Sequence, residues 1–558
     1  MRARALTLLL LAACGGDQTF VIVKVDQRPS VHGAAKLKIT LSNEGSMRTD
    51  ELDLQGKPFP VTFSFSAPGR SGDIGVTVDA VDMMGSLVGR GEGKTTVDAI
   101  EEPTVLLDPA DFVVNTTVAR NQFLSDDFEA IGLQLSTLQT GVWTAVYRDD
   151  CASCEIYGRR FDDKGVAVDS ALASNAMEFR VTTNATTATS IPAIASSGAN
   201  TIVAWDFFDV GGASQGVACR PVTDLGGSPL NQVTISTDSA DVVTTTPLSN
   251  GNFAVTWQTF ATNQVVRGII VDKSCTPVTT TLTVSNVPSG LAAHRSHVAS
   301  NQAAVLYAWI VDGDVRVKIG TNSAVSATET VLIGKTATDQ IDFVRVAPWG
   351  TGFALAVRWS SIDGTGPGKI EVYRTNAAGQ RVPGPPILIT DKSGSDFASD
   401  KSFGIAHRVD DAIFVIWHAC PSGVGSCDVF GRLLRPTGAP VGEELPLATS
   451  TGGDQINPSV IAIGETFVGA WNDGSGLAPD RDGTAVRARV LYPLYDGARG
   501  IRGAPCGSSA ADSPACNMGL SCAGGSDGVM RCYEPCTGAC PHGGSCTSAA
   551  DGSMACTF

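Results

Sequence analysis

The chain alternates apolar and polar positions in short runs almost from its beginning, and a period of two indicates β-strands. Residues 19–111 show this clearly: the run from Phe59 to Phe65 places an aromatic or valine at every second position, and Pro68-Gly69 marks a turn after it. About six or seven such runs fit into this short segment, which predicts a small β-sandwich with the role of a spacer domain.

A longer pattern repeats through residues 112–493. In each copy an apolar strand ends at an aromatic residue, and a loop and a second strand follow, several of them beginning with Gly-Arg as in Gly431-Arg432. The closing aromatics are 50 to 58 residues apart and number seven: Tyr147, Trp205, Trp257, Trp309, Trp359, Trp417 and Trp471. A large side chain at one fixed position is expected to fill the space between neighbouring sheets. The alternative is a row of ligand-stacking aromatics.

The first six copies carry a further strand before the next copy begins, and the seventh copy lacks it. The missing strand is found at the other end of the segment, where Phe112–Thr117 echoes Phe179–Thr183. With the strand that opens each copy, the pattern predicts an all-β fold with a seven-bladed β-propeller, closed by pairing the N-terminal strand into the last blade. The repeat resembles the tandem units of bacterial extracellular propellers, and this resemblance implies a fold rather than one activity.

The first residues have the features of a targeting segment. Arg2 and Arg4 precede the apolar run Leu6–Ala13, which is far shorter than the roughly 20 residues that span a bilayer. The run ends in Leu11-Ala12-Ala13-Cys14, which resembles the lipobox of bacterial lipoproteins. That resemblance implies a signal peptide over residues 1–13 and a lipid anchor, including palmitate, on Cys14. The alternatives are an ordinary secretory signal with a chance Cys, or a short core segment.

The lipoprotein resemblance also implies a location. Residues 14–18 would be a lipid-anchored linker, and Gly15 and Gly16 stand where an Asp favours retention in the inner membrane. We therefore expect a protein held by lipid on the outer membrane or cell surface of a Gram-negative bacterium. Its first partner is the membrane itself, reached through the anchor.

A cysteine-rich module follows a linker at residues 494–502. Residues 503–558 form two matching halves with four cysteines each: Cys506, Cys516, Cys522 and Cys532, then Cys536, Cys540, Cys546 and Cys556. A core this small needs disulfides, and each half allows three pairings. The spacing loosely resembles EGF-like modules, although these have six cysteines. Zinc on Cys536, Cys540 and His542 is the alternative, which an oxidising compartment disfavours.

The remaining cysteines lie in the propeller, apart from Cys14. Cys151 and Cys154 are predicted to staple one loop, with a redox CxxC motif as the alternative. Cys420 and Cys427 share the corresponding loop of the sixth copy. Cys219 and Cys275, in the second and third copies, are predicted to pair between blades.

The net charge and the motifs of the chain restrict the classes of function that it can have. The net charge of −16 disfavours binding to nucleic acid. No HExxH motif and no acidic pair of fixed spacing occurs, and no catalytic residue is predicted.

The loops after each aromatic strand and the linkers between blades emerge on one face, because propeller strands alternate in direction. These loops are long and acidic, whereas the turns of the other face are tight, and binding residues gather on long loops. The candidate binding residues are Asp206, Asp209, Asp363, Asp473, Asp480 and Asp482. They are either solvated loop acids or a face for Ca²⁺ or a cationic partner; no other cofactor is expected.

These features together favour a cell-surface lipoprotein whose propeller is a non-catalytic binding or adhesion platform for an unknown surface protein or glycan. The alternatives are an extracellular hydrolase or lyase acting on polysaccharide, and a structural assembly factor of the envelope.

Overall fold

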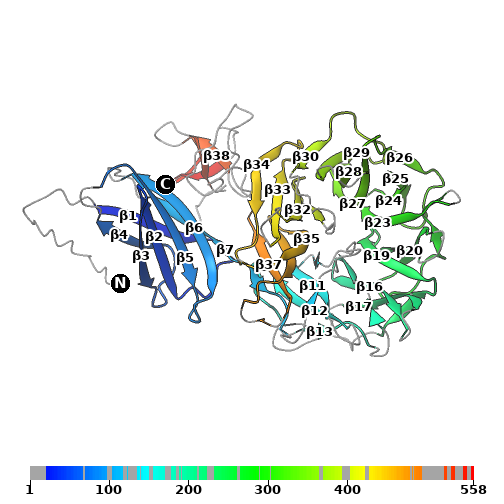
Figure 1. Cartoon of the computed structure of the whole chain (residues 1–558), viewed down its shortest axis with the longest axis horizontal. Helices are drawn as coiled ribbons and strands as arrows, with labels where there is room; N and C mark the ends of the chain where they lie inside the picture. Colours follow the sequence, from blue (N-terminus) through cyan, green and yellow to red (C-terminus); the bar gives the residue numbers. More distant parts are fainter. Residues whose placement is uncertain are drawn as a thin grey trace, which may run out of the picture. The chain divides into compact units, whose positions relative to one another are not determined.

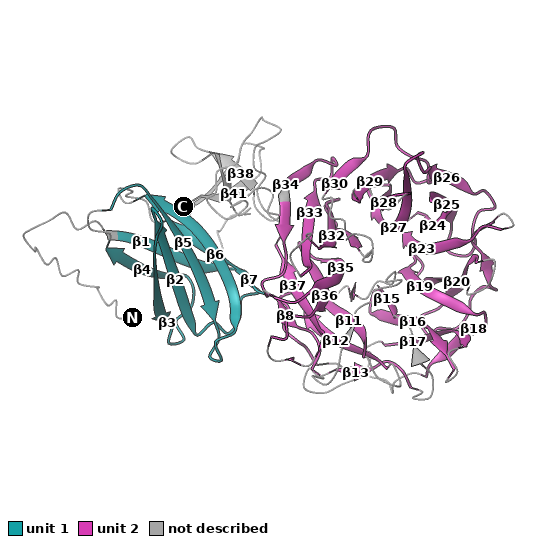
Figure 2. Ribbon diagram, viewed as in Figure 1, with its two compact units in different colours: residues 1–110 teal, residues 111–558 magenta. Residues whose placement is uncertain are grey.

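The computed structural model divides into two compact units, residues 1–110 and residues 111–558 (Figure 2). It describes residues 20–66, 70–96, 103–116, 122–123, 135–138, 140–149, 155–169, 178–183, 188–189, 192–209, 213–222, 231–259, 264–287, 290–301, 303–362, 368–391, 403–420, 426–450, 452–477, 480–481, 483–492, 521–524, 530–533, 545–548 and 554–557. In these residues every regular element is a strand, so none of them forms a helix that could cross a membrane.

The first unit is a single hydrogen-bonded series of seven strands, in the order β3-β2-β5-β6-β7-β1-β4. Their bounds are β1 (Phe20–Gln27), β2 (Lys36–Asn43), β3 (Ser46–Asp53), β4 (Val61–Ser66), β5 (Asp73–Val81), β6 (Leu87–Thr96) and β7 (Thr104–Pro109). Alternate residues are buried, as in β5, and Val23 of β1, Leu37 of β2 and Phe65 of β4 share one core. A shared core between both ends of the series is what the predicted sandwich requires.

The second unit contains seven antiparallel sheets arranged as a ring (Figure 1). Blade 1 is β10 (Leu135–Thr137), β11 (Val142–Asp149), β12 (Ile156–Asp162) and β13 (Phe179–Arg180), with β9 (Gln122–Phe123) beside β11; blade 2 is β15 (Ala193–Ser197), β16 (Asn200–Phe208), β17 (Ser214–Pro221) and β18 (Val233–Ser236), with β14 (Ala188–Thr189) beside β16; blade 3 is β19 (Ala240–Pro247), β20 (Phe253–Thr259), β21 (Val266–Val271) and β22 (Leu282–Thr283); blade 4 is β23 (Ala293–Ser300), β24 (Val305–Val311), β25 (Asp314–Gly320) and β26 (Thr330–Ile333). Blade 5 is β27 (Asp339–Trp349), β28 (Gly352–Ser361), β29 (Lys369–Thr375) and β30 (Ile387–Thr390); blade 6 is β31 (Phe403–His407), β32 (Ile413–Ala419), β33 (Asp428–Leu434) and β34 (Pro440–Pro446); blade 7 is β35 (Gln455–Ile463), β36 (Thr466–Asp473), β37 (Ala485–Leu491) and β8 (Phe112–Val113).

This strand order confirms the predicted seven-bladed β-propeller and its closure. β8 pairs with β37, so the outermost strand of the last blade comes from the start of the unit.

The core lies between the blades rather than within them. In β20 and β32 every residue is buried, because both faces of each sheet are covered by neighbouring sheets. Seven apolar clusters result, and each joins two adjacent blades; one of them contains Trp205 of blade 2 with Phe179 of blade 1. All seven repeated aromatics are at most 5% exposed and belong to the cluster shared with the preceding blade. They therefore pack blades together, as predicted, and form no exposed row for stacking a ligand.

The repeated Gly-Arg pair also joins neighbouring blades. A Cβ on Gly158 or Gly431 would lie 2.6 Å from the ring of Phe179 or 2.4 Å from that of Phe414, so only glycine fits there. The arginine that follows donates to a backbone carbonyl at the outer strand of the preceding blade. In the two Gly-Arg pairs these hydrogen bonds run from Arg159 to Val114 (2.8 Å) and from Arg432 to Ile389 (2.8 Å). Arg220 and Arg489 occupy the same strand position after Cys219 and Ala488, and they donate to Arg180 (2.9 Å) and Leu447 (2.8 Å).

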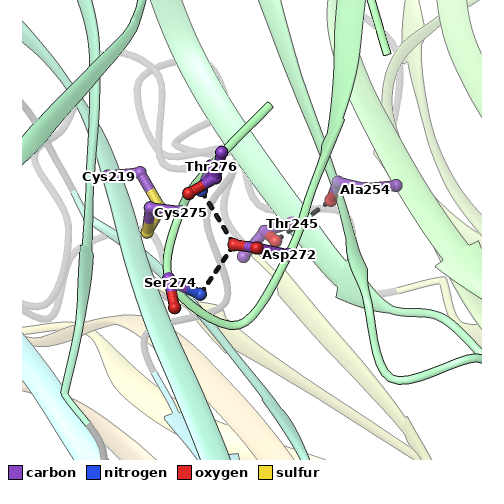
Figure 3. Close-up of a disulfide and its surroundings, with 7 residues drawn as sticks. All are labelled: Cys219, Thr245, Ala254, Asp272, Ser274, Cys275 and Thr276. Carbon is purple, nitrogen blue, oxygen red and sulfur yellow. Dashed lines mark hydrogen bonds between the residues drawn. A yellow bond between two sulfur atoms is a disulfide. The ribbon is translucent and has the colours of Figure 1, made fainter. Parts of the chain in front are cut away.

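One tight turn carries the crosslink between blades 2 and 3. The Oδ1 atom of Asp272 accepts from the backbone N–H groups of Ser274 (2.8 Å) and Thr276 (2.9 Å), and Cys275 forms a disulfide with Cys219 of β17 (Figure 3). Cys275 has a φ of 60°, in the left-handed region where the corresponding turn of blade 1 has Gly165 at 82°. A side chain in this region costs about 1–2 kcal/mol. A thiol at this position therefore replaces the glycine that the backbone prefers.

The other predicted disulfides are only partly covered by the described residues. Cys420 and Cys427 are bonded within their loop. Cys151 and Cys154 lie outside the described residues, as do Cys506, Cys516, Cys536 and Cys540 of the C-terminal module. In that module, β38 (Ser521–Gly524) pairs with β39 (Met530–Tyr533), and β40 (Ser545–Ser548) pairs with β41 (Met554–Thr557). Their backbone register places Cys522 opposite Cys532 and Cys546 opposite Cys556.

The turn at Cys275 yields a stability prediction. Removing the crosslink, whose cysteines are 56 residues apart, should lower the free energy of unfolding by about 4 kcal/mol on the loop-entropy model. The double variant C219A/C275G should then be more stable than C219A/C275A by about 1 kcal/mol, because glycine adopts the left-handed conformation without strain. Denaturant unfolding of both variants measures the difference.

A matched control for the backbone term is Gly251→Ala. Gly251 has a φ of 84° and an added Cβ would meet nothing within 4 Å, so the substitution should cost about 1 kcal/mol through the backbone alone. Equal stability of the two double variants, with the expected loss in G251A, would show that Cys275 is not strained.

Candidate functional site at the mouth of the ring

The first strand of each blade borders the centre of the ring. These inner strands contact one another in sequence around the ring, for example β19 with β23 and β23 with β27. Each inner strand begins on the face that carries the long loops. The linker from the preceding blade reaches that face, and the aromatic strand of the same blade ends on it. We use the name ring mouth for the first residues of the inner strands on this face.

The inner strands bulge at the ring mouth in a repeated way. In blades 3, 4 and 7 two inner-strand residues lie opposite the single repeated tryptophan, and the first of each pair has a positive φ: Val242 (53°), Arg295 (54°) and Asn457 (54°). In blade 5 one extra residue, Asp342, breaks the register at the same level. Bulges redirect the side chains of a strand. Val242 shows the effect, because it belongs to blade 3 and yet packs with the apolar cluster of blades 5 and 6.

The bulges of blades 4 and 5 bring charged groups together. Arg295 donates a hydrogen bond to the backbone carbonyl of Asp342 and lies over the ring of Phe343, with its guanidinium carbon 4.2 Å from the ring centroid. The carboxylate of Asp342 is itself buried and forms an ion pair with Arg358 at 2.5 Å. Asp342 therefore neutralises the arginine of the adjacent strand β28.

Arg345 lies on the same strand as Phe343 and is only 5% exposed. Its guanidinium carbon is 5.7 Å from the ring of Phe343 and 5.7 Å from that of Phe403 in blade 6. Burial, together with the positive charge of Arg295, lowers the pKa of Arg345 below its usual range. Arg345 is therefore buried close to a second arginine.

His297 completes this cluster. Its Nδ1 atom accepts a hydrogen bond from the backbone N–H of Val346 at 3.2 Å, which fixes the ring against the next blade. Burial, and secondarily Arg345, hold the pKa of His297 well below its usual range, so the imidazole is neutral at pH 7.

The predicted acidic residues occupy different surroundings from those expected. Asp206 is 0% exposed, and Asp473 and Asp480 are 1% and 2% exposed, so these three do not form an acidic surface. Asp209 is half-buried and accepts from the backbone N–H of Ala213 and the side-chain amide of Gln215, both at 2.9 Å. Asp363 and Asp482 lie outside the described residues.

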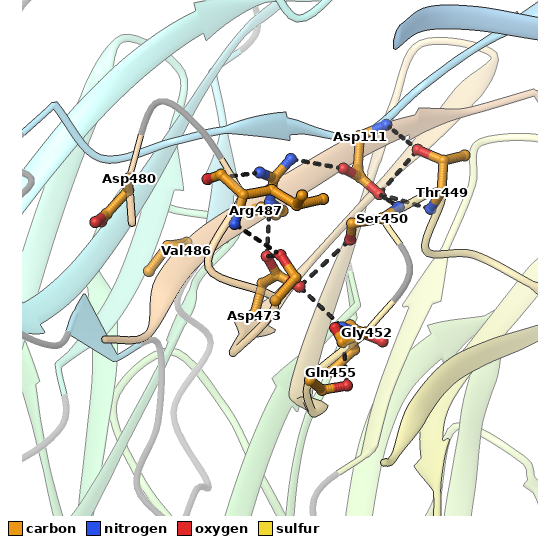
Figure 4. Close-up of polar contacts among 12 residues, drawn as sticks. Asp111, Thr449, Ser450, Gly452, Gln455, Asp473, Asp480, Val486 and Arg487 are labelled. Atoms are coloured by element: carbon orange, nitrogen blue, oxygen red, sulfur yellow. Dashed lines mark hydrogen bonds and ion pairs between the residues drawn. The ribbon is translucent and has the colours of Figure 1, made fainter. Parts of the chain in front are cut away.

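Asp473 belongs to a buried network of ion pairs and hydrogen bonds at blade 7, where the ring closes (Figure 4). Arg487 of β37 binds Asp473 through Nε at 2.7 Å and Asp111, next to β8, through Nη1 at 2.9 Å. Asp111 also accepts from the backbone N–H groups of Thr449 (2.6 Å) and Ser450 (2.9 Å). The network ties the incoming chain to blade 7 and to the end of blade 6, which explains the burial of Asp473.

Asp480 has a similar role at the same closure. Its Oδ2 atom accepts from the side-chain amide of Asn115 at 2.7 Å, and the carbonyl oxygen of that amide accepts from the backbone N–H of Val486 at 2.9 Å. Asp480 therefore holds the residues that follow β8 against β37.

The described residues at the ring mouth do not provide a set of metal ligands. Within it, no group of three or more His, Cys, Asp or Glu side chains is placed to hold a metal ion, and calcium binding stays a prediction. Sequence reasoning missed Arg295, Asp342 and Arg345. No residue pattern marks them, because their meeting depends on a register shift between β-strands.

The architecture defines the class: an all-β chain with a seven-bladed β-propeller. No family model matches the sequence, and no curated protein matches it. Among solved structures, the chain is similar to a protein of unknown function from Dyadobacter fermentans (10% identity, 69% of this chain and 98% of that chain, TM-score 0.40). It is also similar to an ulvan lyase of a polysaccharide lyase family (11%, 69% and 94%, TM-score 0.39) and to an α-L-arabinanase of Penicillium chrysogenum (10%, 68% and 98%, TM-score 0.36).

The closing network yields a prediction about stability. Arg487 pairs with two buried carboxylates, so Arg487→Ala would leave the charges of Asp111 and Asp473 without that cation and should lower the free energy of unfolding by about 3–5 kcal/mol. The control is Lys335→Ala, which removes the exposed ion pair with Asp312 and should cost less than about 1 kcal/mol. Chemical denaturation of the two variants measures both losses, and equal small losses would show that the network does not hold the ring closed.

Proposed function

We propose that this protein is an extracellular binding module whose propeller recognises a polysaccharide at the ring mouth. The repeated bulge supports this proposal most strongly. In blades 3, 4 and 7 it places a non-glycine residue with a positive φ opposite the repeated tryptophan. Such strain is characteristic of binding and active sites, where the fold holds a side chain in a set direction.

The polarity of the ring mouth favours a sugar as the ligand. In blades 3 to 5 its half-buried residues are Asp241, His294, Arg295, Asp339 and Gln340, all of which can form hydrogen bonds. A polyhydroxylated ligand matches such a rim better than an apolar protein surface does.

Two buried carboxylates near the ring mouth serve the structure, which favours binding over catalysis, whereas Asp241 and Asp339 are half-buried at the ring mouth itself. Asp342 is paired with Arg358, and Asp473 with Arg487, so both are used to hold the fold. The alternative function is a hydrolase or lyase acting on polysaccharide, and the same experiment tests it.

The experiment measures binding of the full chain to a panel of neutral and acidic polysaccharides. We expect affinity for at least one of them, and a loss of tenfold or more in His294→Ala and in Gln340→Ala. Lys164→Ala and Asn250→Ala, in exposed turns of the opposite face, should bind as the unsubstituted protein does. Equal losses in both pairs would exclude the ring mouth as the binding surface.

The panel also separates binding from catalysis. Release of reducing ends or of unsaturated sugars during incubation would establish the enzyme instead of the binding module. Binding without product formation supports the proposal.

We further propose that the protein is displayed on the outer membrane or cell surface through a lipid on Cys14. The segment Leu11-Ala12-Ala13-Cys14 supports this, since its small residues and thiol suit lipoprotein processing. Acyl chains on one cysteine would hold the protein at a membrane without a spanning helix.

The anchor is tested by Cys14→Ser. We expect the variant to lose incorporation of a labelled fatty acid and to move from the membrane fraction to the soluble fraction, because the thiol that carries the lipid is absent. A variant that is processed normally and stays membrane-bound would overturn the anchor.

A further inference from the structure

Strand β3 lies at one end of the strand series in the first unit. All 8 of its residues pair with β2 on one side, and among the described strands none pairs with its other side. Met47 is 74% exposed, and the side chains of Arg48 and Asp50 are 64% and 41% exposed, so this edge is open to solvent. An open edge strand of this length is a template for pairing with another strand.

The backbone of β3 presents hydrogen-bonding groups along this edge. β2 and β3 are joined by a turn of two residues, Glu44 and Gly45, whose φ values of 47° and 79° are both positive, as in a type I′ turn. The residues that flank such a turn exchange hydrogen bonds, and hydrogen-bonded pairs then recur at every second position of the ladder. The N–H and C=O groups of Met47, Thr49 and Glu51 therefore point away from β2.

The charges of β3 select one partner for this edge, a second copy of the same strand. In an antiparallel pair related by a two-fold axis, opposite residues share a face of the sheet, so one residue lies opposite its own copy. An axis at Thr49 places Arg48 opposite Asp50 of the second copy, and the reverse pair forms on the other side of the axis. Moving the axis to Arg48, Asp50 or Glu51 would place like charges opposite each other, which is unfavourable.

The charges within one chain are already arranged for this pairing. Arg48 and Asp50 lie on the same face of β3, with Nε of Arg48 2.9 Å from Oδ2 of Asp50. Across the axis the four charges of the two copies alternate in sign. Glu51 is balanced by lysines of β2, since Nζ of Lys36 is 3.9 Å from its carboxylate and Lys38 lies opposite it in the ladder. Charges that would keep a foreign strand from this edge therefore attract a second copy in this register.

We propose that two copies of this chain pair edge to edge along β3, antiparallel, with Thr49 on the two-fold axis. The outward backbone groups of Met47, Thr49 and Glu51 form the new hydrogen bonds, and Met47 becomes covered by the second copy. This inference goes beyond the proposed function and is independent of it, because β3 belongs to the first unit and the ring mouth belongs to the second.

The test measures the mass of the full chain by analytical ultracentrifugation over a range of concentrations. The chain carries Cys14→Ser, so that a lipid cannot hold two copies together. We expect a reversible equilibrium between monomer and dimer. Thr49→Pro should abolish the dimer, because proline removes an N–H group at the centre of the open edge and leaves the ladder to β2 intact. A monomer at every concentration reached, or a dimer that T49P leaves unchanged, would overturn the proposal.

Exchange of charges tests the register. Arg48→Asp and Asp50→Arg should each weaken the dimer by about tenfold, because two pairs of opposite charges become pairs of like charges. The double variant R48D/D50R restores opposite signs across the axis and should dimerise as the parent chain does. The control is Lys94→Asp, at an exposed position of β6, which changes the net charge as R48D does and should have no effect. A double variant as weak as the single variants would exclude this register.

Cross-linking locates the axis. Thr49→Cys places two thiols close together in the dimer, and a short bis-maleimide should join them. The control is Thr62→Cys, at an exposed position of β4 at the other end of the strand series, which should stay monomeric under the same conditions. Equal yields in the two variants, or a higher yield in T62C, would show that the copies do not meet along β3.

Discussion

Packing between neighbouring blades is the interaction on which the whole ring depends. A four-stranded sheet of this protein has two apolar faces, and each is buried only by the sheet beside it. A blade at an open end would expose one face to water, at roughly 25 cal/mol for each Å² of apolar surface. Stability therefore requires closure, and the closure consists of two residue pairs between β8 and β37 together with the buried charges of Asp111, Arg487 and Asp473.

The parts of the fold that repeat could be predicted from the sequence. The seven aromatics gave the number of blades, and the likeness of Phe112–Thr117 to Phe179–Thr183 gave the closing strand, because both follow from local patterns that every copy shares. The roles of the acidic residues could not be predicted. Asp473 is buried because Arg487 binds it, and Arg487 in turn requires Asp111, which is far away along the chain. A partner that is distant in sequence cannot be identified from the residues around Asp473 or Arg487.

Backbone strain is used in two ways in this molecule. At Cys275 a left-handed residue places a thiol where a turn prefers glycine, and the disulfide to Cys219 compensates for that cost. At Arg295 the same backbone region turns a side chain toward the adjacent bulge at Asp342. Neither position is evident from residue type, since cysteine and arginine have no preference for this conformation; both depend on a register that only the paired strands define.

The antiparallel pair of β8 and β37 has a mechanical consequence. The chain enters the ring at Phe112 and leaves it along β37. Because Phe112 lies opposite Ala488, the entry and the exit are at the same end of this strand pair. Tension applied to the segments before Asp111 and after Leu491 would pass through this one seam and peel it bond by bond. The other six blades lie outside the load path and keep their shape until this pair of strands has separated.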